Sequence, residues 1–147
     1  MTEKRKQLLE KSEVERSLTR LAHEMTERLS SIDDIVLIGI RTRGEFIATR
    51  LAKALKKISG NNILIGFLDV TFYRDDFRER LIQPQVKGTE VSFSLDGKAV
   101  ILTDDVLFTG RTIRAALDEI MDFGRPATVA LAVLVDRGHR EMPIKAD

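Results

Sequence analysis

The sequence predicts an α/β protein with a mainly parallel central sheet flanked by helices, and three observations carry that prediction. Short apolar runs with the character of buried strands recur along the chain. Segments with helical periodicity alternate with most of these runs, and such alternation implies right-handed crossovers between parallel strands. A chain of 147 residues with 43% hydrophobic content can build one buried core, so we expect a single domain over residues 1–147.

The first predicted helix begins at Ser12. Ser12 and Glu15 have the spacing of a capping box, in which each side chain bonds the backbone of the other residue. Apolar residues then recur every three or four positions as far as Leu29 and form a stripe that faces the core. The opposite face of this helix is polar and carries a group of neighbouring side chains. These are Arg16, Thr19, Arg20 and His23.

Strands and further helices follow. We predict strands over residues 35–40, 63–70, 98–103 and 127–135, each an apolar run bounded by polar or turn-forming residues. Helices are predicted over residues 46–58, ended by Gly60, and over residues 112–123, ended by Gly124. Ligands of such sheets bind beyond the carboxyl ends of the strands, so a site is expected at that edge.

Residues 71–95 interrupt this pattern. The stretch is polar, has a charged cluster around Arg74, and contains Pro84 and Gly88. Loops of this length without regular structure are uncommon in compact domains and are often lids over a site. We therefore expect a mobile loop or hairpin that covers the active site.

Composition and charge exclude several functional classes. The 24 basic and 23 acidic residues give a net charge of +1, so any contact with nucleic acid must come from a local patch. The absence of cysteine excludes disulfides, a thiolate nucleophile and a thiolate metal site. The charged N-terminus lacks the apolar segment of a signal peptide, and no run approaches the length of a membrane span. We expect a cytoplasmic protein without membrane contact.

The segment VILTDDVLFTGRT, which starts at Val100, has the parts of a ribose-phosphate site. Its apolar strand leads to two adjacent carboxylates, Asp104 and Asp105, which can accept hydrogen bonds from ribose hydroxyls directly or through magnesium. The following turn opens a helix whose free amides and hydroxyls can surround a phosphate. Its residues are Thr109, Gly110, Arg111 and Thr112. Each part alone is more simply an ordinary strand, acidic turn or helix cap; the ordered combination favours the site.

This segment resembles the signature for 5-phosphoribosyl-1-pyrophosphate (PRPP) in the type I phosphoribosyltransferases. Other segments are more narrowly similar to the PyrR family, bacterial attenuators of the pyrimidine operon that also have uracil phosphoribosyltransferase activity. They are TRLAHEM from Thr19, GIRTRG from Gly39, YRDD from Tyr73 and VDRGHREMPIKAD from Val135. The family continues past Asp147 with a segment that helps to hold the base, so the chain as written is expected to bind PRPP but to convert uracil weakly.

The resemblance implies roles for individual residues at the nucleotide site. Pyrophosphate binding is carried over onto Thr42, Arg43 and Gly44, and the chemistry agrees, because arginine can donate two hydrogen bonds to a polyphosphate and glycine allows close approach. Arg74, in the predicted lid, would steady the leaving pyrophosphate. The implied catalytic residues are Arg43, Arg74, Asp104 and Asp105, and the implied cofactor is Mg²⁺, held by the two aspartates directly or through ribose or water.

A second implied function is binding of pyrimidine-operon leader mRNA in response to the uridine nucleotides UMP and UTP. The resemblance also implies a homo-oligomer, a dimer or tetramer. RNA contact is carried over onto Thr19, Arg20, His23, Thr42, His139, Arg140 and Lys145. Without the resemblance, such polar side chains would more simply be solvated. We expect Arg140 and His23 to lie apart from the PRPP segment, so that their removal leaves PRPP affinity unchanged.

The implied reaction is uracil plus PRPP giving UMP plus pyrophosphate. Departure of pyrophosphate leaves positive charge on the ribose, so catalysis would depend on magnesium, Arg43 and exclusion of water. The alternative is a purine or other nucleobase phosphoribosyltransferase without RNA binding. That protein would share the PRPP segment, but purine-specific relatives place an acid where this sequence has Phe108.

Overall fold

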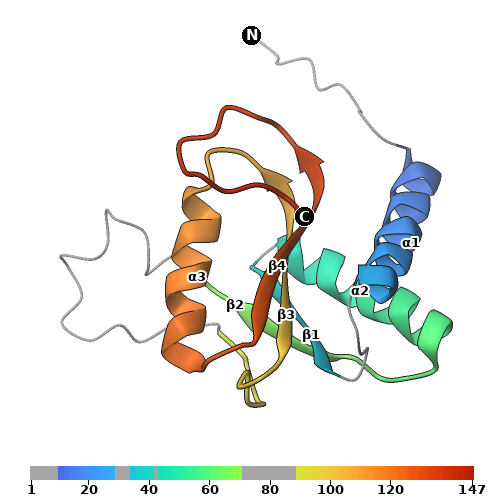
Figure 1. The fold of residues 1–147 in the computed structure, drawn as a ribbon. Coiled ribbons are helices and arrows are strands. Elements are labelled where there is room, and N and C mark those ends of the chain that lie inside the picture. Colours follow the sequence, from blue (N-terminus) through green and yellow to red (C-terminus); the bar gives the residue numbers. More distant parts are fainter. Residues whose placement is uncertain (1–9, 29–33, 42, 71–88) are drawn as a thin grey trace, which may run out of the picture.

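A computed structural model describes residues 10–28, 34–41, 43–70 and 89–147, and its sheet has four parallel strands in the order β2-β1-β3-β4 (Figure 1). The strands are β1 (Ile35–Ile40), β2 (Leu64–Leu68), β3 (Ala99–Leu107) and β4 (Thr128–Asp136). The helices are α1 (Lys11–Arg28), α2 (Arg43–Ser59) and α3 (Arg111–Phe123). The predicted α/β class, parallel sheet and set of helices and strands are confirmed.

Helices cover both faces of the sheet, α1 and α2 on one side and α3 on the other (Figure 1). Strand β1 is buried at every position because it lies in the interior of the sheet between these two layers. On the α1–α2 side the core includes Leu37 and Leu51, and on the α3 side it includes Leu102 and Ile120. The predicted buried character of β1 is therefore confirmed.

Helix α1 begins with a different cap from the one predicted. The backbone N–H of Glu10 donates to the Glu13 side chain at 3.4 Å, and the Glu10 carbonyl accepts from Glu13 and Val14, each at 3.0 Å. Ser12 lies inside the first turn. The capping box predicted for Ser12 and Glu15 is wrong, because the helix begins two residues earlier, where the Glu13 side chain accepts the N–H of Glu10.

Strand β3 continues to Leu107, past its predicted end at Thr103. Its pairing with β1 stops at Thr103, whereas its pairing with β4 continues as far as Leu107 opposite Asp136. Asp104 and Asp105 therefore lie in the part of β3 that pairs with β4 alone. The predicted end of the strand at Thr103 was too early, because β4 supplies the hydrogen bonds that hold these polar residues in a strand. Both carboxylates do lie beyond the end of β1.

The end of the predicted lid is part of the core. Residues 71–88 lie outside the described residues, but Glu90 pairs with Phe67 in an isolated antiparallel bridge, and Leu95 is only 1% exposed. Val91 and Phe93 pack against the α3-side core. The prediction of a lid over 71–95 was therefore too long, and the apolar alternation Val91, Phe93, Leu95 was the signal for packing.

A buried acid in α3 was not anticipated. Glu119 is 0% exposed, and its Oε1 accepts a hydrogen bond from the Thr89 hydroxyl at 2.6 Å. Among the described residues its Oε2 has no hydrogen-bond partner. The pKa of Glu119 is raised to about 7. Burial is the largest cause; the hydrogen bond from Thr89 lowers the pKa, and the charges of Asp69 and Asp122 raise it.

Glu119→Gln should make the protein more stable at pH 8. The folded protein holds a proton on Glu119 that the unfolded chain releases near pH 4.5, so the free energy of unfolding falls as pH rises from 4.5 to about 7. Glutamine keeps the acceptor for Thr89 and cannot ionise. We expect a gain of up to about 3 kcal/mol at pH 8 and little gain at pH 4, measured by urea unfolding. Glu24→Gln, at an exposed position, is the control; an equal gain at both pH values would contradict the explanation.

Candidate active site

Two strand-to-helix connections meet at the carboxyl edge of the sheet (Figure 1). One runs from the end of β1 at Ile40 to the start of α2 at Arg43, and the other from the end of β3 at Leu107 to the start of α3 at Arg111. Because β1 and β3 are adjacent and parallel, these connections emerge at the same edge. Both stretches predicted to bind PRPP therefore lie at the predicted edge of the sheet.

Two glycines bring the start of α2 against the strands. A Cβ atom on Gly44 would lie 2.5 Å from the Thr103 carbonyl oxygen, and one on Gly39 would lie 2.6 Å from the Gly44 carbonyl oxygen. The buried Thr103 hydroxyl donates to the Gly44 carbonyl at 3.1 Å. Gly44 is thus needed for the approach of α2 to β3, a packing role separate from its predicted contact with pyrophosphate.

Arg43 faces the pair of carboxylates. Its Nη1 lies 3.5 Å from Asp105 Oδ2, and its side chain is 81% exposed, against 26% for Asp105. An ion pair of this length and exposure contributes little to stability. The guanidinium can therefore turn from Asp105 to a bound anion at small cost, and the structure brings Arg43, Asp104 and Asp105 together as predicted.

Arg41, two residues before Arg43, has a structural role instead. Its guanidinium pairs with Glu45 at 2.8 Å and with Glu90 at 3.3 Å. It also lies over the Phe67 ring, 5.3 Å from the ring centroid. Arg41 therefore ties the end of β1 to α2 and to the segment that follows residue 88.

The two aspartates differ in their electrostatics. Asp104 Oδ1 accepts the Asp105 N–H at 2.8 Å, and Asp105 Oδ1 accepts the Val106 N–H at 2.8 Å. Burial is the main cause that raises the pKa of Asp104 to about 7, and hydrogen bonding and charge from the Asp105 side chain add to it. Asp104 therefore keeps its proton to near-neutral pH, and a cation bound here would displace that proton.

The donor set fits magnesium that arrives with a substrate. Within the described ranges, no group of three or more His, Asp or Glu side chains could hold a metal ion. Mg²⁺ commonly keeps several waters and is bound by one or two carboxylates together with substrate phosphates. Asp104 and Asp105 supply that number of carboxylates, so they suit a shared magnesium rather than an all-protein metal centre.

The turn before α3 is shaped for an anion. Gly110 is the N-cap residue of α3 with φ 93°, and it has no side chain that could accept a helix amide. The Thr109 hydroxyl accepts the Arg111 N–H at 3.2 Å. The Arg111 side chain is paired with Glu141, whose Oε1 lies 3.1 Å from Nε and 3.0 Å from Nη2. The helix start can thus offer backbone amides to a phosphate, while the contact predicted for the Arg111 side chain stays a prediction.

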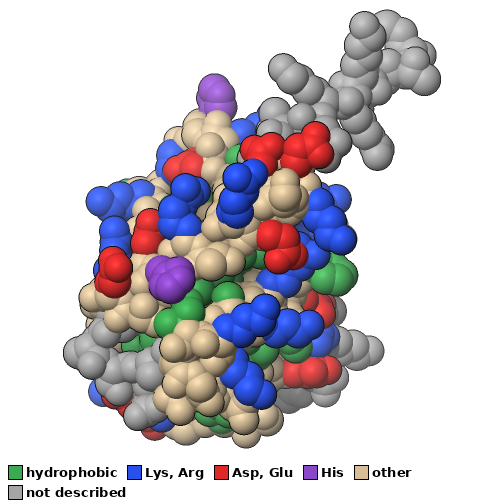
Figure 2. Space-filling view, turned by 90° about the vertical axis from the view of Figure 1, so that its right-hand side faces the viewer, with side chains coloured by type: hydrophobic (Ala, Val, Ile, Leu, Met, Phe, Trp, Pro, Cys, Tyr) green, Lys and Arg blue, Asp and Glu red, His purple; other side chains and the backbone are tan. Residues whose placement is uncertain are grey.

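The residues predicted to contact RNA form two groups. One lies on the polar face of α1 and the other in the segment after β4, and all except Arg140 are exposed. They are Thr19, Arg20 and His23 in the first group, and His139, Arg140 and Lys145 in the second. Figure 2 shows both histidines in one view of the molecule, one of them at the upper rim, with Lys and Arg but also Asp and Glu side chains on the surface between them. Two other predicted site residues, Thr42 and Arg74, lie outside the described residues.

Arg140 does not lie apart from the PRPP segment. Its Nη1 donates to the carbonyl of Phe108, directly before the Thr109–Thr112 turn, at 2.7 Å. The expected separation is therefore wrong for Arg140. The sequence could not reveal this contact, because the two residues are brought together by the return of the chain after β4.

A groove of about 860 Å³ between α1 and α2 extends the first group. Thr19 and His23 lie on its α1 side. Its α2 side carries four cations that the sequence analysis did not single out. They are Arg50, Lys53, Lys56 and Lys57. The available signal was their occurrence together on the polar face of the second predicted helix.

Comparisons with known proteins agree with this arrangement. The chain matches the phosphoribosyl transferase domain family over residues 4–147. It is 54% identical over 147 residues to the bifunctional protein PyrR of Pelotomaculum thermopropionicum, covering 100% of this chain and 81% of that protein. For the bifunctional protein PyrR of Clostridioides difficile the identity is 50% over 141 residues, covering 96% and 80%. A hypoxanthine phosphoribosyltransferase structure from Staphylococcus aureus has a TM-score of 0.76 at 20% identity, covering 97% of this chain and 74% of that one.

Proposed function

This chain belongs to the PyrR family of phosphoribosyltransferases, and from that membership we propose that it regulates pyrimidine biosynthesis and also makes UMP. In this proposal it binds operon leader mRNA in response to uridine nucleotides and converts uracil and PRPP to UMP and pyrophosphate. The identity of 54% with a bifunctional PyrR over the whole chain carries the proposal. The clustering of Arg43, Asp104 and Asp105 at the carboxyl edge of the sheet supports the enzymatic part.

PRPP would lie across the two connections. Its 5-phosphate suits the uncapped start of α3, its ribose hydroxyls suit Asp104 and Asp105, and its pyrophosphate suits the exposed guanidinium of Arg43 with Thr42 and Gly44. As the bond from ribose C1 to the pyrophosphate oxygen breaks, uracil N1 forms the new bond to C1 and gives up its proton to water or to the departing pyrophosphate. Arg43 would offset charge on the departing pyrophosphate, with Arg74 as a second proposed contact. Magnesium held by Asp104 and Asp105 would supply further neutralisation.

The purine alternative has no support beyond the fold. The likeness to the Staphylococcus aureus hypoxanthine enzyme is at 20% identity and shows a common fold. Phe108, 41% exposed, stands where a purine enzyme would have an acid. A release assay for pyrophosphate, with PRPP and Mg²⁺, compares uracil, hypoxanthine, guanine and orotate. We expect release with uracil alone; release with hypoxanthine or guanine at an equal rate would refute the uracil assignment.

The RNA partner is proposed to bind the face that carries both histidine-containing groups. Thr19, Arg20 and His23 would contact it from α1, and His139 and Lys145 from the segment after β4; Thr42 is a further proposed contact. The position of both histidines in one view of the surface, which also carries Lys and Arg side chains, supports this (Figure 2).

Among the described residues, no helix is long and apolar enough to span a membrane. We propose a cytoplasmic dimer or tetramer, which sedimentation of the purified protein would measure.

Arg20→Ala and His23→Ala should weaken RNA binding in different ways. If Arg20 contacts one phosphate, its loss should reduce the slope of log affinity against log salt by about 0.7 to 0.9. The His23 ring is better suited to a base in a single-stranded loop than to a phosphate, so its loss should lower sequence preference more than salt dependence. Filter binding of UMP-saturated protein to a leader hairpin and a scrambled hairpin, across a salt series, measures both. Arg125→Ala is the exposed-cation control, and equal affinity of the parent for both hairpins would refute the regulator.

A further inference from the structure

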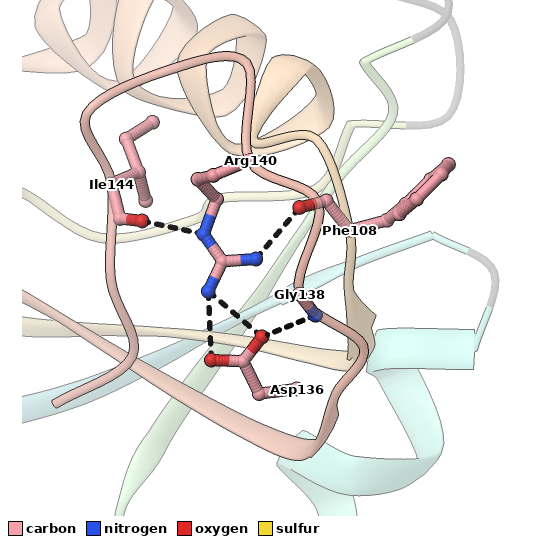
Figure 3. A network of polar contacts seen from close by, with 5 residues as sticks. All are labelled: Phe108, Asp136, Gly138, Arg140 and Ile144. Atoms are coloured by element: carbon pink, nitrogen blue, oxygen red, sulfur yellow. Dashed lines mark hydrogen bonds and ion pairs between the residues drawn. The ribbon is translucent and has the colours of Figure 1, made fainter.

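Arg140 is the centre of a polar network that joins three parts of the chain (Figure 3). Its Nη2 lies 2.8 Å and 2.7 Å from the two carboxylate oxygens of Asp136, the last residue of β4. Its Nε donates to the Ile144 carbonyl at 2.7 Å, and its Nη1 to the Phe108 carbonyl at 2.7 Å. The side chain is 23% exposed. Every nitrogen of this guanidinium is thus engaged within the protein.

Further hydrogen bonds join the end of β3 and the turn before α3 to the segment that follows β4. The Arg137 N–H donates to the Leu107 carbonyl at 2.8 Å, and the N–H groups of Glu141 and Met142 donate to the Thr109 carbonyl at 2.8 and 2.9 Å. Gly110 lies against the same stretch, since a Cβ atom on it would be 3.0 Å from Met142 Cβ. The turn before α3 therefore takes its shape partly from the segment that follows β4.

The geometry suits arginine in particular. A planar guanidinium can meet a carboxylate and two carbonyls in different directions at once, and a lysine ammonium cannot reproduce that fork. Hydrogen bonds from a charged donor are stronger than neutral ones, and these are short. An exposed cation held only for solubility or for phosphate contact would not need three internal acceptors.

We propose that Arg140 is a positioning residue for PRPP, holding the turn from Phe108 to Gly110 in the conformation that presents the amides of α3 to the phosphate. The inference rests on the proposed function, since it concerns affinity for PRPP. Arg140 acts through the Phe108 carbonyl and does not touch the ligand. Its effect on RNA then comes from shaping the segment that carries His139, in addition to any contact through its remaining N–H.

Calorimetric titration of PRPP with Mg²⁺ into Arg140→Ala and Arg140→Lys tests the proposal. We expect about a tenfold loss of PRPP affinity in the alanine variant and partial recovery in the lysine variant, because lysine can keep only part of the network. The apparent KM for PRPP should rise and the KM for uracil should not. Arg125→Ala is the control, since it removes an exposed cation that is outside the network and outside both proposed sites, and it should keep PRPP affinity.

Hydrogen exchange separates this proposal from the proposed function. In ligand-free Arg140→Ala, the amides of Glu141 and Met142, which bond to Thr109, should exchange faster than in the parent at a temperature where both proteins are folded. Failure of the parent itself to bind PRPP would refute the proposed function. The exchange rates of the Glu141 and Met142 amides would then still test whether Arg140 holds the turn. A folded Arg140→Ala protein with parental PRPP affinity and parental exchange would overturn the positioning role.

Discussion

Asparagine at both Asp104 and Asp105 is expected to lower PRPP affinity at least about 100-fold, since two charge-assisted interactions with ribose or shared magnesium would be lost. Asparagine is nearly isosteric with aspartate and keeps an oxygen that can accept the N–H groups of Asp105 and Val106. The double variant should therefore remain folded. Calorimetry with PRPP and Mg²⁺ at pH 8, where the raised pKa of Asp104 is exceeded, measures the loss.

The control for this variant is Asp34→Asn. Asp34 is exposed and precedes β1, at the opposite edge of the sheet from the two carboxylates. Its replacement alters charge without altering the candidate site and should leave PRPP affinity within twofold. Unchanged PRPP affinity in the double variant, with an unchanged circular dichroism spectrum, would remove both aspartates from the site.

Gly44→Ala is expected to destabilise the protein by about 1–3 kcal/mol through overpacking. Helix propensity alone would favour alanine over glycine by up to about 1 kcal/mol at this position in α2. The added Cβ, however, would stand 2.5 Å from the backbone oxygen of Thr103, which a buried strand cannot easily move. Relief of the clash would push the start of α2 outward and carry Arg43 with it, so PRPP affinity should fall too.

Urea unfolding and PRPP calorimetry measure the two effects of Gly44→Ala. Gly97→Ala is the comparison, because Gly97 has a φ of +71° but open space around its Cβ position. Its cost should be limited to backbone strain, about 1–2 kcal/mol, and it should keep PRPP affinity. A Gly44→Ala protein as stable as the parent would show that α2 tolerates displacement from β3.

Patterns within each element predicted the fold well, since the apolar run of β1 and the stripe of α1 each carry their own signal. The pairing of strands was harder to predict. The extension of β3 through Asp104 depends on β4, which lies beyond α3 in the chain, so the apolar run alone indicated a strand that ends at Thr103. The burial of Glu119 was hidden in the same way, because a single glutamate on a helix predicts exposure until its tertiary neighbours are known.

The site residues also divide into those with a local signal in the sequence and those that depend on tertiary contacts. Arg43 could be foreseen because it follows β1, and Asp104 and Asp105 because they follow the apolar run of β3; parallel strands deliver their carboxyl ends to one edge. The network around Arg140 could not, since none of its bonds to Phe108 or Ile144 leaves a periodic signal in the sequence. The proposed roles of Thr19 and His23 depend on family resemblance, as an exposed helix face has no chemistry that would distinguish contact from solvation.

The contact between Arg43 and Asp105 joins residues that are 62 positions apart in the chain, so the binding surface forms only when distant segments have packed together. Closing so long a loop costs chain entropy that only the packed sheet and helices can offset. A nascent chain that has formed β1 and α2 contains Arg43 but not yet Asp104 and Asp105. These two aspartates are held in a strand only after β3 has paired with β4. Ligand affinity should therefore arise late and cooperatively in folding, and PRPP at 100 times its Kd would stabilise the completed domain by about 2.7 kcal/mol without rescuing partly folded chains.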